Sequence, residues 1–233
     1  MGSKVTVITP VYNESKTLER SIALIRNALE NTPHEIIIVD DNSPDGSGEL
    51  ADRLASSSSG VRVLHRPRKM GLGTAYKDGF ELSSGDLIVS MDSDLSHDPR
   101  YLLPMIKCAS SHDIVIGSRL VPGGGIIGRT PFRDILSITV NWVIRLLTRV
   151  KIHDWTSGLR VYRRDVWQRT MPLVQCDKWD FQFESLYKAV KNGYTVAELP
   201  ITFYERAEGE SKFSLKEGLT FLISFIKIMI NLK

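Results

Sequence analysis

Short apolar runs recur along the first half of the chain and alternate with segments of helical periodicity. The runs predict β-strands at Val5–Val11, His34–Asp41, Val61–His65, Asp86–Met91 and Asp113–Ser118. The centre of the second run, HEIIIVDD, is continuously apolar, which is typical of a strand buried on both faces of a parallel sheet. This alternation predicts a doubly wound α/β fold, with a sheet flanked by helices.

The second half of the chain follows a different pattern. A flexible break is predicted at Gly123–Gly125, and strands are predicted at Gly158–Tyr162 and Val196–Phe203. Helical spacing with several aromatic residues predicts a helix at Lys178–Lys191. The strand–helix alternation of the first 120 residues therefore gives way to a more varied arrangement.

Two further helices are predicted that are apolar except for one narrow polar stripe. In Ile135–Val150 the stripe consists of Ser137, Asn141, Arg145 and Thr148. In Phe213–Leu232 it consists of Lys216, Thr220, Ser224, Lys227 and Asn231. Such helices lie either in the core of the domain or in the interface of a membrane. Partial burial against the domain is expected in both cases.

The composition is that of a globular chain with a sizeable core. Of 233 residues, 42% are hydrophobic and 24% charged, and the net charge of +3 is too small to predict a nucleic-acid partner. Cys108 and Cys176 form neither a metal-binding motif nor a disulfide framework, which favours a reducing compartment. Neither a signal peptide nor a membrane-spanning helix is predicted.

Three of the predicted strands end in acidic or polar residues. These are Tyr12 and Glu14, Asp40 and Asp41, and Asp92 and Asp94. If the strands are neighbours, the residues share a crevice at the carboxyl edge of the sheet, where open α/β sheets bind ligands. Asp92 and Asp94 can face one ligand, and their oxygens suit Mg²⁺ or Mn²⁺ holding phosphates. A solvated acidic turn is the alternative.

Other candidate motifs are weaker. The segment Gly71–Tyr76 (GLGTAY) contains G-x-G, but Tyr76 stands where a dinucleotide fingerprint has its third glycine. A nicotinamide or flavin site is therefore disfavoured, and the glycines predict close backbone approach instead. His97 lies beside the acidic pair and either contacts a ligand or has a structural role.

Basic residues gather late in the chain, near the starts of the two apolar helices. They are Arg119, Arg129, Arg133, Arg206 and Lys212. Arginine forks and lysine charges suit phosphate oxygens, although solvated surface cations are the commoner case. A cationic rim beside apolar surface would fit a lipid-linked phosphate.

Taken in order, the motifs resemble those of a known family. Six segments are similar to the successive motifs of the family 2 glycosyltransferases: VTVITPVYNE, IIIVDDNSPDG, MDSDLSHDP, IVIGSR, DWTSGLRVY and RAEGESK. The resemblance implies their GT-A (Rossmann-like) fold, a mixed, mostly parallel sheet flanked by helices. Within that family the resemblance is strongest to the polyprenyl-phosphate (dolichyl-phosphate) mannose synthases. The similarity runs from Val5 to the C-terminus in the family's order, which makes it far more specific than an isolated Asp-x-Asp.

The resemblance implies an enzyme that transfers mannose from GDP-mannose to a polyprenyl (dolichyl) phosphate with inversion. It implies a catalytic domain at residues 1–212, including an amphipathic helix near 133–150, and a membrane-interface helix at 213–233. It also implies peripheral attachment at the cytoplasmic face of a membrane. That attachment would rest on the two apolar helices, on an anchoring partner subunit, or on a segment absent from this chain.

The resemblance also assigns residue roles. The nucleoside would be held by Pro10, Tyr12, Glu14, Val39 and Asp41, with a main-chain contact from Ser93. A divalent metal, Mg²⁺ or Mn²⁺, would be held on the donor diphosphate by Asp92 and Asp94, with Ser96 a further candidate where some members have Gln. Donor and acceptor phosphates would be neutralised by Arg119, Arg206 and Lys212, with Arg133 as a helper.

Three alternatives remain open. The first is an enzyme that transfers glucose or an aminosugar from a UDP donor to polyprenyl phosphate. The second is an enzyme that transfers its sugar to a water-soluble acceptor. The third alternative, from a different class, is a non-catalytic nucleotide-binding subunit at a membrane. The acidic pair Asp92 and Asp94 argues against the last of these, and the late cationic and apolar elements favour a lipid acceptor.

Overall fold

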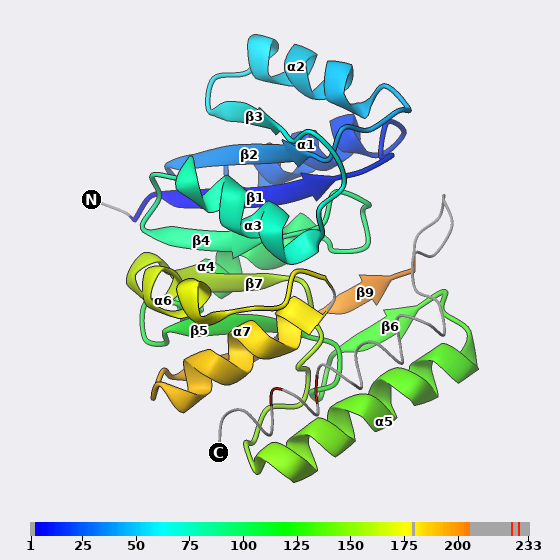
Figure 1. Ribbon diagram of the computed structural model, residues 1–233, viewed down its shortest axis with the longest axis vertical. Coiled ribbons are helices and arrows are strands. Elements are labelled where there is room, and N and C mark those ends of the chain that lie inside the picture. Colours follow the sequence, from blue (N-terminus) through cyan, green and yellow to red (C-terminus); the bar gives the residue numbers. More distant parts are fainter. Residues whose placement is uncertain (1–2, 179, 206–224, 226–227, 229–233) are drawn as a thin grey trace.

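Seven strands form the central sheet of the computed structural model, which describes residues 3–178, 180–205, 225 and 228 (Figure 1). Their order is β3-β2-β1-β4-β7-β5-β8, and β7 is antiparallel to both neighbours whereas the other pairs are parallel. The strands are β1 (Val5–Val11), β2 (His34–Asp40), β3 (Val61–His65), β4 (Leu87–Ser90), β5 (Ile114–Ser118), β7 (Arg160–Arg163) and β8 (Val196–Pro200). The predicted mixed, mostly parallel sheet is confirmed.

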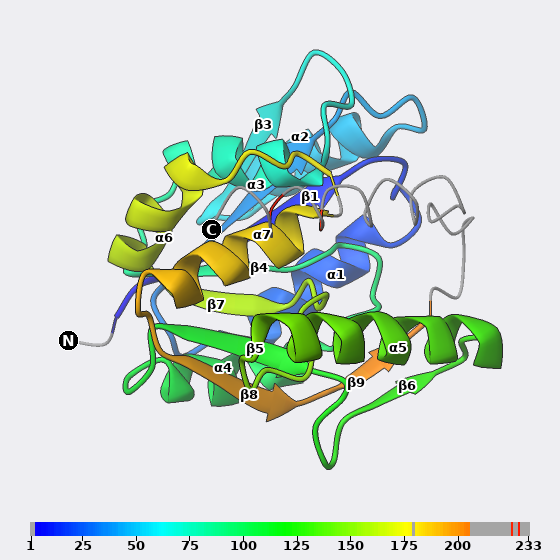
Figure 2. The ribbon, with the colours of Figure 1, turned by 60° about the horizontal axis from the view of Figure 1, so that its bottom comes forward.

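Helices cover both faces of this sheet (Figures 1 and 2). They are α1 (Leu18–Ala28), α2 (Ser47–Ser57), α3 (Leu72–Glu81), α4 (Leu102–Cys108), α5 (Pro131–Thr148), α6 (Arg164–Thr170) and α7 (Asp180–Lys191), with short 3₁₀ turns at Pro99–Tyr101 and Met171–Leu173.

The continuous apolar run of β2 supplies both layers of the core. Successive strand residues point to opposite faces, so Ile36 and Ile38 belong to the core cluster that contains Leu18 and Ile22 of α1. Ile37 and Val39 belong to the opposite cluster with Tyr76 and Phe181, from α3 and α7. β2 is therefore buried on both faces, as its sequence predicts.

A small second sheet lies beyond the carboxyl edge of the main one. It pairs β6 (Gly125–Ile127) with β9 (Thr202–Tyr204). The prediction of one strand at Val196–Phe203 is wrong, because the chain leaves the main sheet at the buried Ile201, whose N–H donates to Ser118. The predicted flexible break at Gly123–Gly125 is also wrong at its last residue, which begins β6.

Helix α5 is docked through a narrow face on which Asn141 of the polar stripe and the apolar Ile144 are buried. Asn141 is buried, donates to Thr156 Oγ1 at 3.1 Å and accepts from the Trp155 N–H at 2.7 Å. On the outside, Phe132, Ile135 and Trp142 are more than 60% exposed. The helix predicted at Ile135–Val150 is thus confirmed, and its apolar face is turned to the surface. Figure 2 shows it alongside β6 and β9.

The second apolar segment is described only at two positions. Phe225 and Ile228 are buried in the core cluster that contains α7, and the Phe225 ring lies 5.0 Å from that of Phe183. The rest of Phe213–Leu232, and the domain boundary predicted at residue 212, lie outside the described residues. No helix in the described part of the chain is both long and apolar enough to cross a membrane.

Glu35, buried at the start of β2, is expected to make stability depend on pH. Burial alone would raise its pKa, but hydrogen bonds from Thr6 Oγ1 at 2.7 Å and from Ser84 lower the pKa of Glu35 from 4.5 to about 2. A carboxylate with a lowered pKa stabilises the folded state above its unfolded pKa and loses that contribution on protonation. Glu35→Gln should therefore lower the free energy of unfolding at pH 7 by about 3 kcal/mol. Urea titrations should show this difference disappearing between pH 4.5 and about 2.

Candidate active site

Three loops meet at the carboxyl edge of the sheet because β1 lies between β2 and β4. Hydrogen bonds join the loops after β1 and β2: the amide of Glu14 donates to Ser47 Oγ at 2.9 Å, and that of Asn13 to Ser43 Oγ at 3.1 Å. Ser93 Oγ, in the loop after β4, donates to the Pro10 carbonyl at 3.3 Å. The sequence-based expectation that these three strand ends share one edge is confirmed.

The two carboxylates after β4 are held by different partners. The hydroxyl of Tyr76, buried in α3, donates to Asp92 Oδ1 at 3.2 Å. Asp94 Oδ1 accepts from the Ser96 amide at 3.0 Å and from the Ser96 hydroxyl at 2.5 Å. Between Asp94 and Ser96, Leu95 has a φ of 63°, an unfavourable conformation for a branched residue. The loop is therefore folded around these carboxylates at a cost in backbone strain.

The residues present fit a divalent metal bound together with phosphates. Asp92 and Asp94 offer hard oxygen ligands, and Mg²⁺-type sites commonly combine one or two carboxylates with substrate phosphates and water. Gly158 keeps space open beside them, since a Cβ there would lie only 3.3 Å from Asp92 Oδ2. Among the described residues no group of three or more His, Cys, Asp or Glu side chains is arranged as a metal site. The metal contact of Ser96 stays a prediction, because its hydroxyl hydrogen is directed at Asp94.

The predicted nucleoside residues lie around the loops after β1 and β2. Tyr12 has the ammonium of Lys69 4.4 Å above its ring, and Glu14 accepts a hydrogen bond from Thr17. The side chain of Val39 is fully buried in the core, so any nucleoside contact from it would come from its main chain.

Asp41 is a buried carboxylate with a nearby cation. Its Oδ1 lies 2.8 Å from Nη1 of Arg66, which is also buried. Burial raises the pKa of Asp41, and the positive charges of Arg66 and Lys69 only partly offset that rise. Arg66 also pairs with Asp78 at 3.1 Å, so it links the β2 loop to α3.

Arg119, predicted to neutralise phosphate, is bound to a carboxylate that the sequence did not single out for this role. Its Nε and Nη2 donate to Asp154 at 2.7 and 2.6 Å, and Nη2 also donates to Thr156 at 2.8 Å. Burial alone would lower the pKa of Arg119, but the Asp154 carboxylate raises it. The guanidinium is thus held in one orientation, with its Cζ 5.6 Å from the centroid of the Phe203 ring.

Arg133 and Arg129 share the carboxylate of Glu205 at the start of α5. Burial would raise the pKa of Glu205, and the two guanidinium groups lower it. Arg129 lies 5.1 Å from the Phe203 ring, which also contacts His97, itself 4.0 Å from Asp92. A continuous set of contacts therefore runs from the acidic pair to the first turn of α5. The predicted phosphate ligands Arg206 and Lys212 lie outside the described residues.

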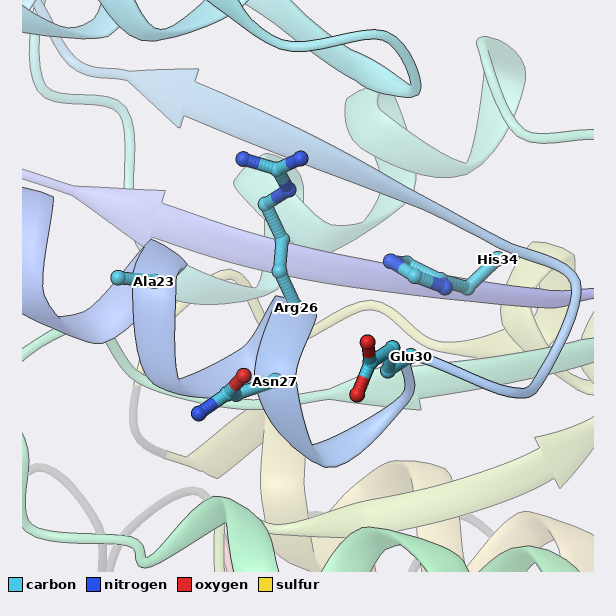
Figure 3. Close-up of a pocket in the computed structure, with 5 residues that line it drawn as sticks. All are labelled: Ala23, Arg26, Asn27, Glu30 and His34. Atoms are coloured by element: carbon cyan, nitrogen blue, oxygen red, sulfur yellow. The ribbon is translucent and has the colours of Figure 1, made fainter.

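A surface hollow lies at the opposite edge of the sheet from this site. It is lined by Ala23, Arg26, Asn27, Glu30 and His34 (Figure 3). His34 begins β2, so the hollow sits at the amino edge, away from Asp92 and Asp94. None of the residues predicted to bind ligands lines it.

A mixed α/β sheet gathers an Asp-x-Asp pair and the polar loops of two neighbouring strands at its carboxyl edge, as expected for a glycosyltransferase of GT-A fold. The model of glycosyl transferase family 2 matches residues 6–170, and the chain belongs to that family.

Similar proteins include the polyprenol monophosphomannose synthase of Mycolicibacterium smegmatis, which is 42% identical over 214 residues covering 89% of this chain and 80% of the relative. The undecaprenyl-phosphate mannosyltransferase of Micrococcus luteus is 37% identical over 215 residues, covering 91% and 88%.

Solved structures share the fold at lower identity. The glucosyl-3-phosphoglycerate synthase of Mycobacterium tuberculosis, in complex with Mn²⁺, UDP and phosphoglyceric acid, has a TM-score of 0.72 at 19% identity, covering 99% of this chain and 78% of its own. A mannosyltransferase of Pyrobaculum calidifontis, in complex with GDP-Man and Mn²⁺, has a TM-score of 0.63 at 19% identity, covering 91% and 59%.

Proposed function

We propose that this glycosyltransferase moves mannose from GDP-mannose to a polyprenyl (dolichyl) phosphate, giving polyprenyl-phosphate mannose with inversion. The observation that carries the proposal is the position of α5. The contacts that start at Asp92 run through His97 and Phe203 to Arg129, just before the first turn of α5, and the exposed apolar face of α5 starts there. A water-soluble donor at the acidic pair and a lipid acceptor along α5 would meet at this point. The two relatives that match about nine-tenths of this chain are named for mannose transfer to polyprenol or undecaprenyl phosphate, which supports the acceptor and the sugar of this proposal.

The chemistry proposed is a single displacement. An oxygen of the acceptor phosphate forms a bond to the anomeric carbon of mannose, while the bond from that carbon to the GDP diphosphate breaks and GDP leaves. The acceptor phosphate is already anionic at neutral pH, since its second pKa is about 6, so it needs little help from a general base. In-line attack on the opposite face of the sugar inverts the anomeric centre.

The proposal gives each part of the site one task. Asp92 and Asp94 would hold Mg²⁺ or Mn²⁺ on the diphosphate, and Ser96 would orient Asp94. A bound divalent metal would stabilise negative charge on the departing diphosphate. The nucleoside would be held by Pro10, Tyr12, Glu14, Val39, Asp41 and Ser93. The anionic groups would be positioned and neutralised by Arg119, Arg133, Arg206 and Lys212.

The same proposal places the chain peripherally on the cytoplasmic face of a membrane, through the apolar face of α5. Interfacial helices bind by burying apolar side chains at the boundary of headgroups and acyl chains. An anchoring partner subunit is compatible with this arrangement and would add to the attachment.

A donor panel tests the function. The protein is incubated with Mn²⁺ or Mg²⁺, polyprenyl phosphate and one radiolabelled donor, and label extracted into organic solvent is counted. We expect label from GDP-mannose and background counts from UDP-glucose and UDP-N-acetylglucosamine. Label from a UDP-sugar alone would replace the donor assignment. Nucleotide binding without transfer to lipid or to water-soluble acceptors would favour a non-catalytic subunit.

A further inference from the structure

Gln182, in the first turn of α7, is a buried amide whose hydrogen-bonding groups are not used by the described part of the protein. The residue is 3% exposed, and neither Oε1 nor Nε2 has a hydrogen-bond partner among the described residues. Its own carbonyl accepts from Arg160 at 2.7 Å, so only the side chain is unsatisfied. Burying an amide without partners opposes folding, which makes a role toward a ligand worth seeking.

The neighbouring polar residue of α7 shows the ordinary arrangement. Glu184 is equally buried, and its carboxylate accepts from the main-chain amides of Gln175 and Cys176 and from Lys188. The helix can therefore satisfy a buried polar side chain where the position serves only the fold. Gln182 is the exception within this helix.

The amide lies beside the acidic pair. A Cβ placed on Gly158 would be 3.8 Å from Gln182 Nε2, 3.3 Å from Asp92 Oδ2 and 3.5 Å from His97 Cε1. The three side chains thus converge within 4 Å of one point beside Gly158, where a glycine contributes no side chain of its own. In Figure 1 the amino end of α7 lies on the same side of the molecule as the carboxyl ends of β1 and β4.

The residues on either side of Gln182 fix its direction. Phe181 stacks on Tyr76, the residue that donates to Asp92, with 6.0 Å between ring centroids. Phe183 packs against Trp155 with 5.7 Å between ring centroids. Both phenylalanines are buried, so α7 cannot rotate to expose the amide to water. Such a rigid support is what a ligand-binding side chain requires.

We propose that Gln182 recognises hydroxyl groups of the donor hexose and so determines which sugar is transferred. An amide offers both donor and acceptor atoms, as a pair of neighbouring sugar hydroxyls does. An ionised phosphate offers only acceptors and would leave Oε1 unsatisfied, which favours the hexose over the diphosphate as the ligand. The inference rests on the proposed function, because it requires a nucleotide-hexose bound with its diphosphate at Asp92 and Asp94.

Monodeoxy analogues of the donor, combined with Gln182→Met, test this assignment. For the wild type, removing the recognised hydroxyl should lower kcat/KM by about 100-fold, because the amide is then left buried and unpaired. In Gln182→Met, which keeps the size but not the polar atoms, the parent and deoxy donors should be used at nearly equal rates. The affinity for GDP with Mn²⁺ should be unchanged, and the melting temperature should rise because an unsatisfied amide is removed.

Gln168→Met is the matched control, since Gln168 is exposed on α6 and lies away from Asp92. It should keep the wild-type ratio between parent and deoxy donors. The proposal is overturned if every deoxy ratio in Gln182→Met equals that of the wild type. A lower melting temperature together with unchanged ratios would assign Gln182 to the fold alone, and Gln182→Leu would repeat the measurement if the methionine variant does not fold.

The donor assignment can fail separately. If the wild type transfers sugar from another nucleotide, the deoxy series of that donor is used. The result for Gln182 is then independent of the assignment of GDP-mannose as the donor. If no transfer occurs, calorimetry compares the nucleotide-sugar with the free nucleotide in both proteins. Loss of the sugar's contribution in Gln182→Met alone supports the assignment, and an equal contribution in both proteins refutes it.

Discussion

Replacing Asp94 with alanine or asparagine is expected to lower kcat/KM for sugar transfer by about 1000-fold, the scale on which charge stabilisation at a reacting centre acts. Asp94 is buried, and Ser96 holds its Oδ1 in place through two hydrogen bonds. Asparagine keeps an oxygen that can accept those bonds and removes only the charge. A loss of similar size in both variants would therefore identify the negative charge, rather than the loop conformation, as the requirement.

Two quantities are measured for each variant: the rate of sugar transfer and the affinity for GDP. Titrating GDP with and without Mn²⁺ should show metal-dependent binding in the wild type and a much smaller metal effect in Asp94→Asn. Asp98→Asn is the control, because Asp98 lies in the same loop but accepts from the Arg100 amide and pairs with the Arg100 guanidinium. It should retain near wild-type turnover. Wild-type turnover by Asp94→Asn after removal of free metal would contradict the metal assignment.

The sequence predicts most of the sheet because burial on two faces leaves a strong signal. β2 is apolar at every central position, and its neighbours β1 and β4 carry similar runs, so the three strands and their polar ends could be located. The acidic pair was found for the same reason, since it follows directly from a buried strand. The strands and the acidic pair can be predicted because they depend only on the order of apolar and polar residues and on the common carboxyl edge of parallel strands.

The supporting partners could not be predicted, because they come from distant parts of the chain. Tyr76 lies 16 residues before Asp92, and Asp154 lies 35 residues after Arg119. Tyr76 interrupts a glycine-rich segment, and in the sequence alone this indicates only that a dinucleotide site is absent. Glu205 pairs with Arg129 and Arg133 only because β9 leaves the main sheet and lies beside β6.

The direction of α5 is the other feature that local pattern leaves open. A narrow polar stripe on an apolar helix fits a core helix and an interfacial helix equally well. The structure selects between them through Asn141, whose amide joins Thr156 and the main chain of Trp155. The helix buries Asn141 and Ile144 against the protein, and most of its large apolar side chains face outward.

Replacing Ile138, Trp142 and Leu146 together with glutamine is expected to remove the protein from lipid vesicles. These side chains are 52%, 61% and 59% exposed, so their apolar groups are available to a membrane. Full burial of each large apolar side chain would contribute about 1.5–3 kcal/mol. Partial burial at the interface, summed over three residues, still predicts a fall in vesicle partitioning of about 100-fold. Glutamine is a good helix former, so the melting temperature should change little.

The lipid acceptor makes this change visible in catalysis. In vesicles, kcat/KM for a long-chain polyprenyl phosphate should fall with the loss of binding, whereas turnover of a short, water-soluble prenyl phosphate should stay near the wild-type value. Leu24→Gln with Leu103→Gln is the matched control, since both leucines are exposed on other helices, α1 and α4. A triple variant that still sediments with vesicles but changes from dimer to monomer in solution would show that the apolar face of α5 binds a second copy of the chain instead of a membrane.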